Sequence, residues 1–222
     1  MAEQKKSFVV EFYLRIFDEL KKRSLFAFVS QRVPSQFDLW FVEGWAIGHL
    51  MLSVLALFAW PVLISCPWKI LLVFYGVSRV FEVVIYQINV LFFQWYRSFK
   101  EKKIPEARGY LRIILLLLHN YVEITFWFAF FYLNAHWAFD PQSLSSPLVS
   151  LNFSFVTITT FGHSIVSPKS SVGYFLTLIQ STIGLFMMVM IISRFISYIP
   201  KYKTTDEVEQ FEERTSAEEK SK

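Results

Sequence analysis

Apolar residues gather in four long runs along the chain, at about residues 39–65, 70–96, 110–135 and 172–199. A helix needs roughly 20 apolar residues to cross the hydrocarbon core of a bilayer, which is about 30 Å thick. Stretches such as 50–65 and 113–118 are apolar at consecutive positions, whereas membrane strands alternate in polarity. The pattern predicts an all-α membrane protein with four transmembrane helices.

A shorter apolar segment lies in the connection between the third and fourth runs, at about residues 136–171. Ser145-Ser146-Pro147 is a helix start signal, in which serine caps the helix and proline is its first residue. The run 148–158 that follows is about three turns long, too short to cross a bilayer. Irregular backbone at membrane depth must be buried in protein or line a watery cavity. We therefore predict a re-entrant helix and loop here.

Basic residues are distributed unevenly along the chain. They concentrate before the first run and between the second and third, whereas the other two connections contain only Lys69 and Lys169. Lysine and arginine accumulate in short cytoplasmic loops. We expect a multi-pass protein of the plasma (inner) membrane with both termini in the cytoplasm.

These patterns divide the chain into five segments. Residues 1–37 read as an amphipathic helix at the cytoplasmic interface or, alternatively, as a cytoplasmic helix packed on the bundle. Residues 38–97 form a two-helix transmembrane hairpin, 98–109 a basic cytoplasmic loop, 110–200 the segment with the re-entrant loop, and 201–222 a charged cytoplasmic tail.

The loop after the short helix carries a recognisable pattern. Residues 157–168 read TITTFGHSIVSP, which resembles, without a gap, the potassium-channel filter T-x-T-T-V-G-Y-G-D-x-x-P. In that superfamily, backbone carbonyls and a threonine hydroxyl replace the water around the ion. The resemblance covers about residues 110–199 and implies an outer helix, a pore helix, a filter and an inner helix. It implies filter support from Thr157 and Thr159 and a filter of Thr160, Phe161, Gly162, His163 and Ser164.

Two glycines of the fourth run also match the superfamily. Gly173 and Gly184 stand where the family uses glycine for inner-helix packing and for a hinge. Ser181 and Met188 share a face with Gly184, and the resemblance implies that this face lines the pore cavity. The alternative is an ordinary contact between membrane helices through small residues.

The outer end of the filter departs from the family pattern at His163, Ser164 and Ile165. Serine in place of glycine in a left-handed conformation costs about 1 kcal/mol, so we expect distorted or open outer ion sites. A histidine ring titrates near neutral pH and repels cations once protonated. We expect current to fall at acidic external pH, which single-channel recordings at two external pH values would test. Alternatively, the ring faces backwards and bonds to the pore helix.

Charged residues inside the apolar runs need partners, because unpaired charge in a membrane is costly. Arg79 and Glu82 are three residues apart, which favours an intrahelical or interhelical salt bridge over a proton or ligand path. His119 and Glu123 lie one turn apart and could bind a metal, although packing is the simpler role. The second run contains a single arginine rather than a repeated series, so we expect no voltage sensor.

These observations favour a tetrameric cation channel that passes potassium, with sodium leak if selectivity is weak. We expect no enzymatic activity, no cofactor besides the conducted ions, no nucleic-acid partner, and an unidentified cytoplasmic regulator as a partner. The alternative is a non-conducting membrane component whose vestigial pore loop remains while the protein binds a partner. A membrane enzyme or transporter using His119 and Glu123 is less favoured, because a nucleophile with its base and inverted repeats are missing. The single cysteine, Cys66, excludes an intrachain disulfide.

Overall fold

The computed structural model describes residues 8–22, 25–30, 32, 38–93, 96–97, 109–140, 144, 146–162 and 166–198 of the 222-residue chain. Within this part the elements are, in chain order, α1 (Phe8–Lys22), α2 (Leu25–Ser30), α3 (Asp38–Phe58), α4 (Trp60–Leu63), α5 (Trp68–Ile88), the π-helix η2 (Asn89–Phe93), α7 (Tyr110–Asn134), the 3-10 helix η3 (His136–Ala138), α8 (Pro147–Ile158) and α9 (Ser171–Tyr198). The all-α prediction is confirmed. The basic loop 98–108 and the tail 201–222 lie outside the described residues.

The four predicted long helices correspond to α3, α5, α7 and α9. The first was predicted too long, because α3 ends at Phe58 instead of continuing to residue 65. Pro61 follows within one turn, and its ring and missing N–H prevent the helix from continuing unbroken. The chain instead makes the short helix α4, with Pro61 in its first turn. The second predicted run ends in the π-helix η2 rather than in regular α-helix.

Three described helices are long and apolar enough to cross a membrane, namely Trp40–Phe58, Leu111–Asn134 and Ser171–Ser197. They belong to α3, α7 and α9. The fourth prediction, α5, is 21 residues long but is not among these three. It carries the buried charges of Arg79 and Glu82. By length and composition, the described part therefore contains three spans beside the polar helix α5.

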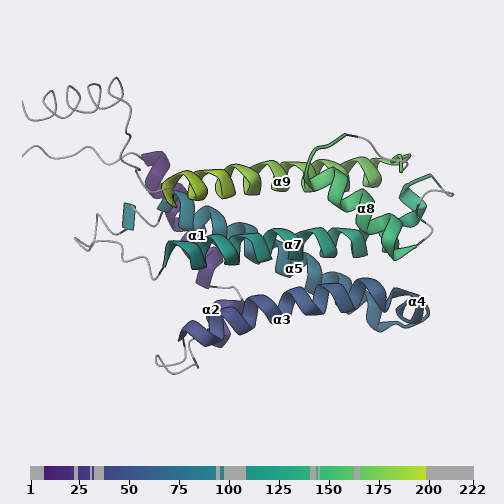
Figure 1. Ribbon diagram of the computed structural model, residues 1–222, viewed down its shortest axis with the longest axis horizontal. Coiled ribbons are helices and arrows are strands. Elements are labelled where there is room, and N and C mark those ends of the chain that lie inside the picture. The colour runs from purple at the N-terminus through teal and green to yellow at the C-terminus, as the bar shows by residue number, and fades with distance from the viewer. Residues whose placement is uncertain are drawn as a thin grey trace, which may run out of the picture.

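The long helices lie side by side, with α7 at the centre (Figure 1). α7 contacts α3, α5, α8 and α9. The short helices α1 and α2 lie at one end of the bundle, and α4 and α8 lie at the other. Since each long helix runs opposite to the preceding one, the described starts of α3 and α7 and the end of α9 share one end.

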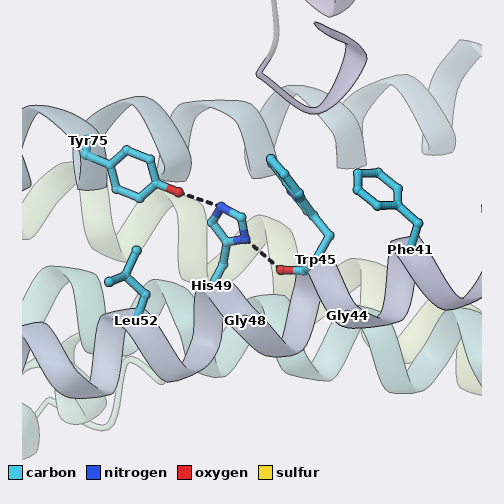
Figure 2. A pocket seen from close by; sticks show the side chains of 7 residues that line it. All are labelled: Phe41, Gly44, Trp45, Gly48, His49, Leu52 and Tyr75. Atoms are coloured by element: carbon cyan, nitrogen blue, oxygen red, sulfur yellow. Dashed lines mark hydrogen bonds between the residues drawn. The ribbon is translucent and has the colours of Figure 1, made fainter. Parts of the chain in front are cut away.

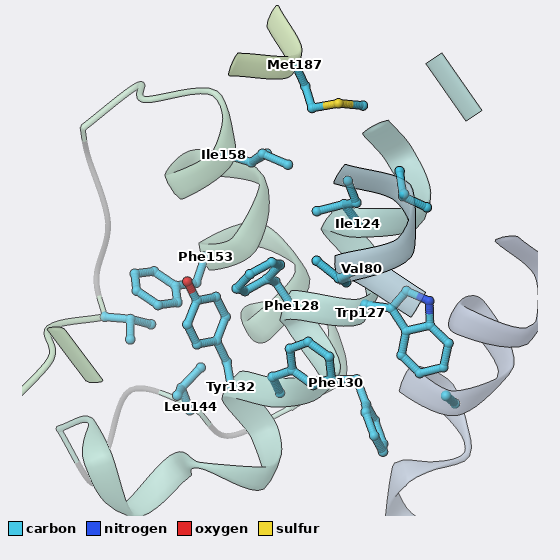
Figure 3. Close-up of a cluster of buried hydrophobic side chains, with 14 of the residues drawn as sticks. Val80, Ile124, Trp127, Phe128, Phe130, Tyr132, Leu144, Phe153, Ile158 and Met187 are labelled. Carbon is cyan, nitrogen blue, oxygen red and sulfur yellow. The ribbon is translucent and has the colours of Figure 1, made fainter. Parts of the chain in front are cut away.

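The main hydrophobic core surrounds the C-terminal half of α7, where α8 packs against it. Trp127, Phe130 and Tyr132 are fully buried there, and Figure 3 shows Tyr132 beside Phe153 of α8. The centroids of these two rings are 4.6 Å apart. Packing on α7 therefore determines the position of the short helix.

The N-terminal helix α1 packs against α5 at the opposite end. Leu14 on α1 is buried, while Phe8 and Phe12 are exposed. Arg97 donates a hydrogen bond to the carboxylate of Asp18 and so ties the end of the α5 segment to α1. The contact with the bundle is thus present, and contact of the exposed face with lipid stays a prediction.

Candidate functional site

The short helix α8 begins where the sequence predicted. Ser146 is its N-cap, with an oxygen that accepts a hydrogen bond from the Val149 N–H at 3.3 Å, and Pro147 is the first helical residue. The serine oxygen satisfies one of the free backbone N–H groups at the helix start. The proline has no N–H group that would need a partner, so both residues favour helix initiation. The helix ends at Ile158 and is 12 residues long. It lies at the end of the bundle that also carries α4.

Two serines attach α8 to α7. The Ser150 hydroxyl donates to the carbonyl oxygen of Ala129 at 2.6 Å, and the Ser154 hydroxyl donates to that of Thr125 at 2.7 Å. Both serines are fully buried. Residues four apart lie on one helix face, so α8 presents a polar edge to the α7 backbone. Small residues of this kind let membrane helices approach closely.

Gln180 of α9 forms hydrogen bonds with both α7 and α8. Its amide nitrogen donates to the carbonyl and the hydroxyl of Ser154 at 3.0 and 2.6 Å. Its amide oxygen accepts a hydrogen bond from the Tyr132 hydroxyl at 2.5 Å. Gln180 is fully buried and was not among the residues predicted from the sequence. A lone carboxamide within an apolar run, opposite serines spaced by four, is the signal that could have identified it.

The chain after α8 turns sharply at the predicted filter. Thr160 and Gly162 have positive φ values of 57° and 76°, whereas Phe161 between them does not. Thr160 is the sole non-glycine residue with positive φ in the described part of the chain. A β-branched residue in this region is strained, and such strain clusters at functional sites. Alternation of left- and right-handed residues is the backbone feature expected of a filter strand.

The other predicted loop residues take different positions. The side chain of Phe161 is 77% exposed, and Thr160 is exposed beside it. Thr157 and Thr159 are half-buried and donate hydrogen bonds to the carbonyl oxygens of Phe153 and Phe155, at 2.8 and 2.7 Å. The predicted filter residues His163 and Ser164, and also Ile165, lie outside the described residues.

The two ends of the re-entrant segment are joined to each other. The Asp140 N–H donates to the Ser167 carbonyl at 3.1 Å, and the Lys169 N–H donates to the Ala138 carbonyl at 3.0 Å. An antiparallel bridge pairs Phe139 with Pro168. The loop therefore leaves and re-enters the bundle at one place, beside the start of α9.

Gly173 and Gly184 lie where α9 touches neighbouring backbone. A Cβ atom on Gly184 would be 2.2 Å from the carbonyl oxygen of Ile158, and one on Gly173 would be 2.6 Å from that of Ala138. Both positions therefore exclude a side chain. α9 is one continuous helix from Ser171 to Tyr198, so the hinge role of Gly184 remains a prediction.

The predicted cavity face of α9 is partly occupied within the single chain. The Ser181 hydroxyl is 3.5 Å from the carbonyl oxygen of Thr157, to which it donates. Met188 is 36% exposed. The contact of Gly184 with α8 matches the alternative of a small-residue helix contact, and lining of a pore cavity by Ser181 and Met188 remains a prediction.

A buried charge cluster connects α5 to α7 in the middle of the bundle. The expected ion pair between Arg79 and Glu82 is present at 2.8 Å. Arg79 also donates two hydrogen bonds to Glu123 on α7, at 2.8 and 3.1 Å. Glu123 is 1% exposed and accepts a further hydrogen bond from the Trp127 indole N–H. One arginine therefore serves two carboxylates.

The second pair considered from the sequence does not come together. The imidazole of His119 hydrogen-bonds to the carbonyl oxygen of Leu115 at 2.7 Å, while Glu123 is engaged by Arg79. No group of three or more candidate metal ligands exists among the described residues. His119 and Glu123 are thus involved in separate interactions.

A second polar pair, in which His49 is buried and Tyr75 half-buried, crosses from α3 to α5, as Figure 2 shows. The Nδ1–H group of His49 donates to the Trp45 carbonyl oxygen at 2.6 Å. The hydroxyl of Tyr75 then donates to Nε2 of His49 at 2.5 Å. The pair borders a groove of about 380 Å³ along Gly44 and Gly48. No role for this pair was predicted from the sequence.

The fold and site define a multi-pass helical membrane protein with a re-entrant helix and loop. Residues 116–201 match the model of a family described as an ion channel. No curated protein and no solved structure matches the chain. The matched segment comprises most of α7, all of α8, the loop and α9, and it leaves α1 to α5 unmatched.

Proposed function

We propose that four copies of the chain form a cation channel that passes potassium through a filter of Thr160, Phe161, Gly162, His163 and Ser164. The observation that carries the proposal is the coincidence of the ion-channel family match with the re-entrant helix and its turn. The match covers residues 116–201, and the alternation of positive φ at Thr160 and Gly162 lies inside it. Carbonyl oxygens in such a strand can replace the water around an ion.

A tetramer follows from the amount of filter that one chain supplies. One re-entrant loop provides about a quarter of the ring that surrounds an ion in this type of pore. The exposed side chain of Phe161 supports a neighbour at the loop, and exposed apolar residues of α9, among them Leu185 and Val189, support contact with lipid or another copy. We propose cytoplasmic termini in the plasma membrane on the basis of the charge distribution.

Ion flux through reconstituted protein tests the proposal. We expect liposomes containing the chain to release potassium down a gradient, and Gly162→Ala to reduce this flux at least about tenfold, because alanine is strained at positive φ. The matched control is Gly109→Ala. Gly109 also has positive φ, at 102°, but it lies at the start of α7 outside the pore loop. We expect this variant to retain flux.

Parallel gradients of sodium and potassium measure selectivity in the same liposomes. A flux ratio far above one indicates potassium selectivity, and similar fluxes indicate a weakly selective cation pore. Correctly assembled tetramers that pass neither ion under any condition would contradict conduction. That result favours a non-conducting component with a vestigial pore loop.

A further inference from the structure

A second cavity lies away from the pore loop, between the first helices and α7. Its volume is about 550 Å³, and its walls come from α2, α3, the second half of α5 and the first half of α7. This volume is within the range of small-molecule sites. The cavity lies toward the end of the bundle that carries α1 and α2, whereas α8 lies at the other end.

Two carboxamides on the cavity wall have no hydrogen-bond partner in the described part of the chain. Gln87 of α5 is 5% exposed and Asn120 of α7 is 8% exposed, and both line the cavity. Trp45, on the same wall, has a buried indole N–H without an acceptor. Buried polar groups in proteins are nearly always paired. The amides of Gln87 and Asn120 therefore offer hydrogen-bonding groups to a molecule in the cavity.

The charged groups on this wall are paired with one another, and the Arg79 cluster has one more carboxylate than cations. Arg79 pairs with Glu82 and Glu123, and Arg97 donates to Asp18 and to the amide oxygen of Asn89. Both arginines on the wall are therefore already used. An anionic ligand would enter without a cation to pair with, at a large desolvation cost.

The remaining surface of the cavity is mostly apolar. Val42 and Ala46 of α3, Val83 of α5 and Leu116 of α7 contribute to it. A ligand that fits this wall has a hydrocarbon body and one small polar head. The bilayer around these helices is a source of such molecules.

We propose that the cavity binds an uncharged single-chain lipid of the monoacylglycerol type. Its ester and hydroxyl groups accept hydrogen bonds from, and donate them to, the amides of Gln87 and Asn120. The acyl chain lies along the apolar wall. This site is independent of ion conduction, and the proposal does not rest on the proposed function.

Photo-crosslinking in lipid nanodiscs tests the site directly. The probe is 1-decanoylglycerol with a diazirine on its chain, applied to the full-length protein and mapped by peptide mass spectrometry. We expect labelling on α3, α5 and α7 segments around the cavity. Unlabelled 1-decanoylglycerol should compete at concentrations at least about tenfold lower than decanoate, which has a similar chain but carries a negative charge.

Shape-conserving variants identify the groups responsible. Gln87→Met and Asn120→Leu should each reduce cavity labelling about fivefold, the effect expected for one lost hydrogen bond. Ala46→Phe fills the cavity and should abolish labelling while leaving both amides in place. The matched control is Asn134→Leu on α7, because Asn134 is outside the cavity and bonds to the Phe130 carbonyl. It should label as the wild type does.

Three results would overturn the proposal. They are labelling spread evenly over lipid-facing residues, equal competition by decanoate, and cavity labelling that survives Ala46→Phe. Thermal unfolding of each variant identifies those that do not fold. If an amide variant fails to fold, competition on the wild type and Ala46→Phe still decide the outcome.

Discussion

At the residue scale, a single arginine organises the buried charges. Arg79 is three residues from Glu82, and this spacing led to the prediction of their pair. Glu123 lies on another helix, 44 residues away, yet it receives two hydrogen bonds from the same guanidinium. Arginine suits this position because its planar fork can bind a carboxylate through two N–H groups.

Removal of Arg79 is expected to destabilise the protein strongly. Arg79→Leu leaves Glu82 and Glu123 buried without a cation, and breaking such a pair typically costs about 3 kcal/mol or more. Chemical unfolding in detergent measures the change in the free energy of unfolding. Adding Glu123→Gln to Arg79→Leu should recover part of the loss, because one uncompensated charge disappears.

The matched control is Arg112→Leu. Arg112 pairs with Glu43 at the same 2.8 Å distance, but the two side chains are 25% and 42% exposed. Exposed pairs contribute about 1 kcal/mol or less. Equal losses in the Arg79 and Arg112 variants would show that burial of the pair does not determine its contribution.

At the element scale, the position of α8 depends on contacts from two sides. Ser150 and Ser154 attach it to α7, and Gln180 and Gly184 attach it to α9. Backbone carbonyls accept several of these bonds, so the contact depends on how closely the helices approach. The turn at Thr160 and Gly162 follows directly from the end of α8.

A methyl group at Gly184 should push α9 away from α8. In Gly184→Ala the new Cβ would lie 2.2 Å from the Ile158 carbonyl oxygen, and backbone cannot move aside as a flexible side chain does. Overpacking of this kind costs about 1–3 kcal/mol. We expect a lower unfolding temperature and reduced ion flux.

Gly48→Ala is the control for this variant. Gly48 also lies in a long apolar helix, but a Cβ atom there meets nothing within 4 Å. Alanine favours helix more than glycine does, so stability should stay the same or rise slightly. Similar destabilisation by both variants would contradict close α8–α9 packing as the cause.

At the scale of the whole molecule, the antiparallel arrangement of the long helices places two groups of loops at opposite ends (Figure 1). The turn between α4 and α5 lies at the same end as α8 and the loop that follows it. The basic segments, by contrast, precede α3 or follow α5 in the chain. The predicted orientation therefore places the α4–α5 turn outside the cell.

Cys66, the only cysteine, lies in that turn and is partly exposed. We expect a membrane-impermeant maleimide to label it in right-side-out vesicles without permeabilisation. A second protein, Cys66→Ser with Ser197→Cys, moves the thiol to the exposed last turn of α9. Its labelling should require permeabilisation. The reverse pattern would place the termini outside.

The sequence by itself determined the helical class, the number of long helices and the start of the re-entrant helix. These properties depend on local chemistry. The length of an apolar run sets whether a helix can cross a bilayer, and Ser146 with Pro147 marks a helix start irrespective of neighbours. The end of α3 was misplaced because the apolar pattern continues through Pro61, where the backbone cannot.

The tertiary structure alone decided which polar groups meet. Hydrophobic composition does not specify how each helix is rotated about its axis or how closely it approaches its neighbours. The roles of Gln180 and Glu123 depend on those rotations, and so does the cavity between Gln87 and Asn120. Sequence spacing identifies partners on one helix, whereas partners on different helices are brought together by packing.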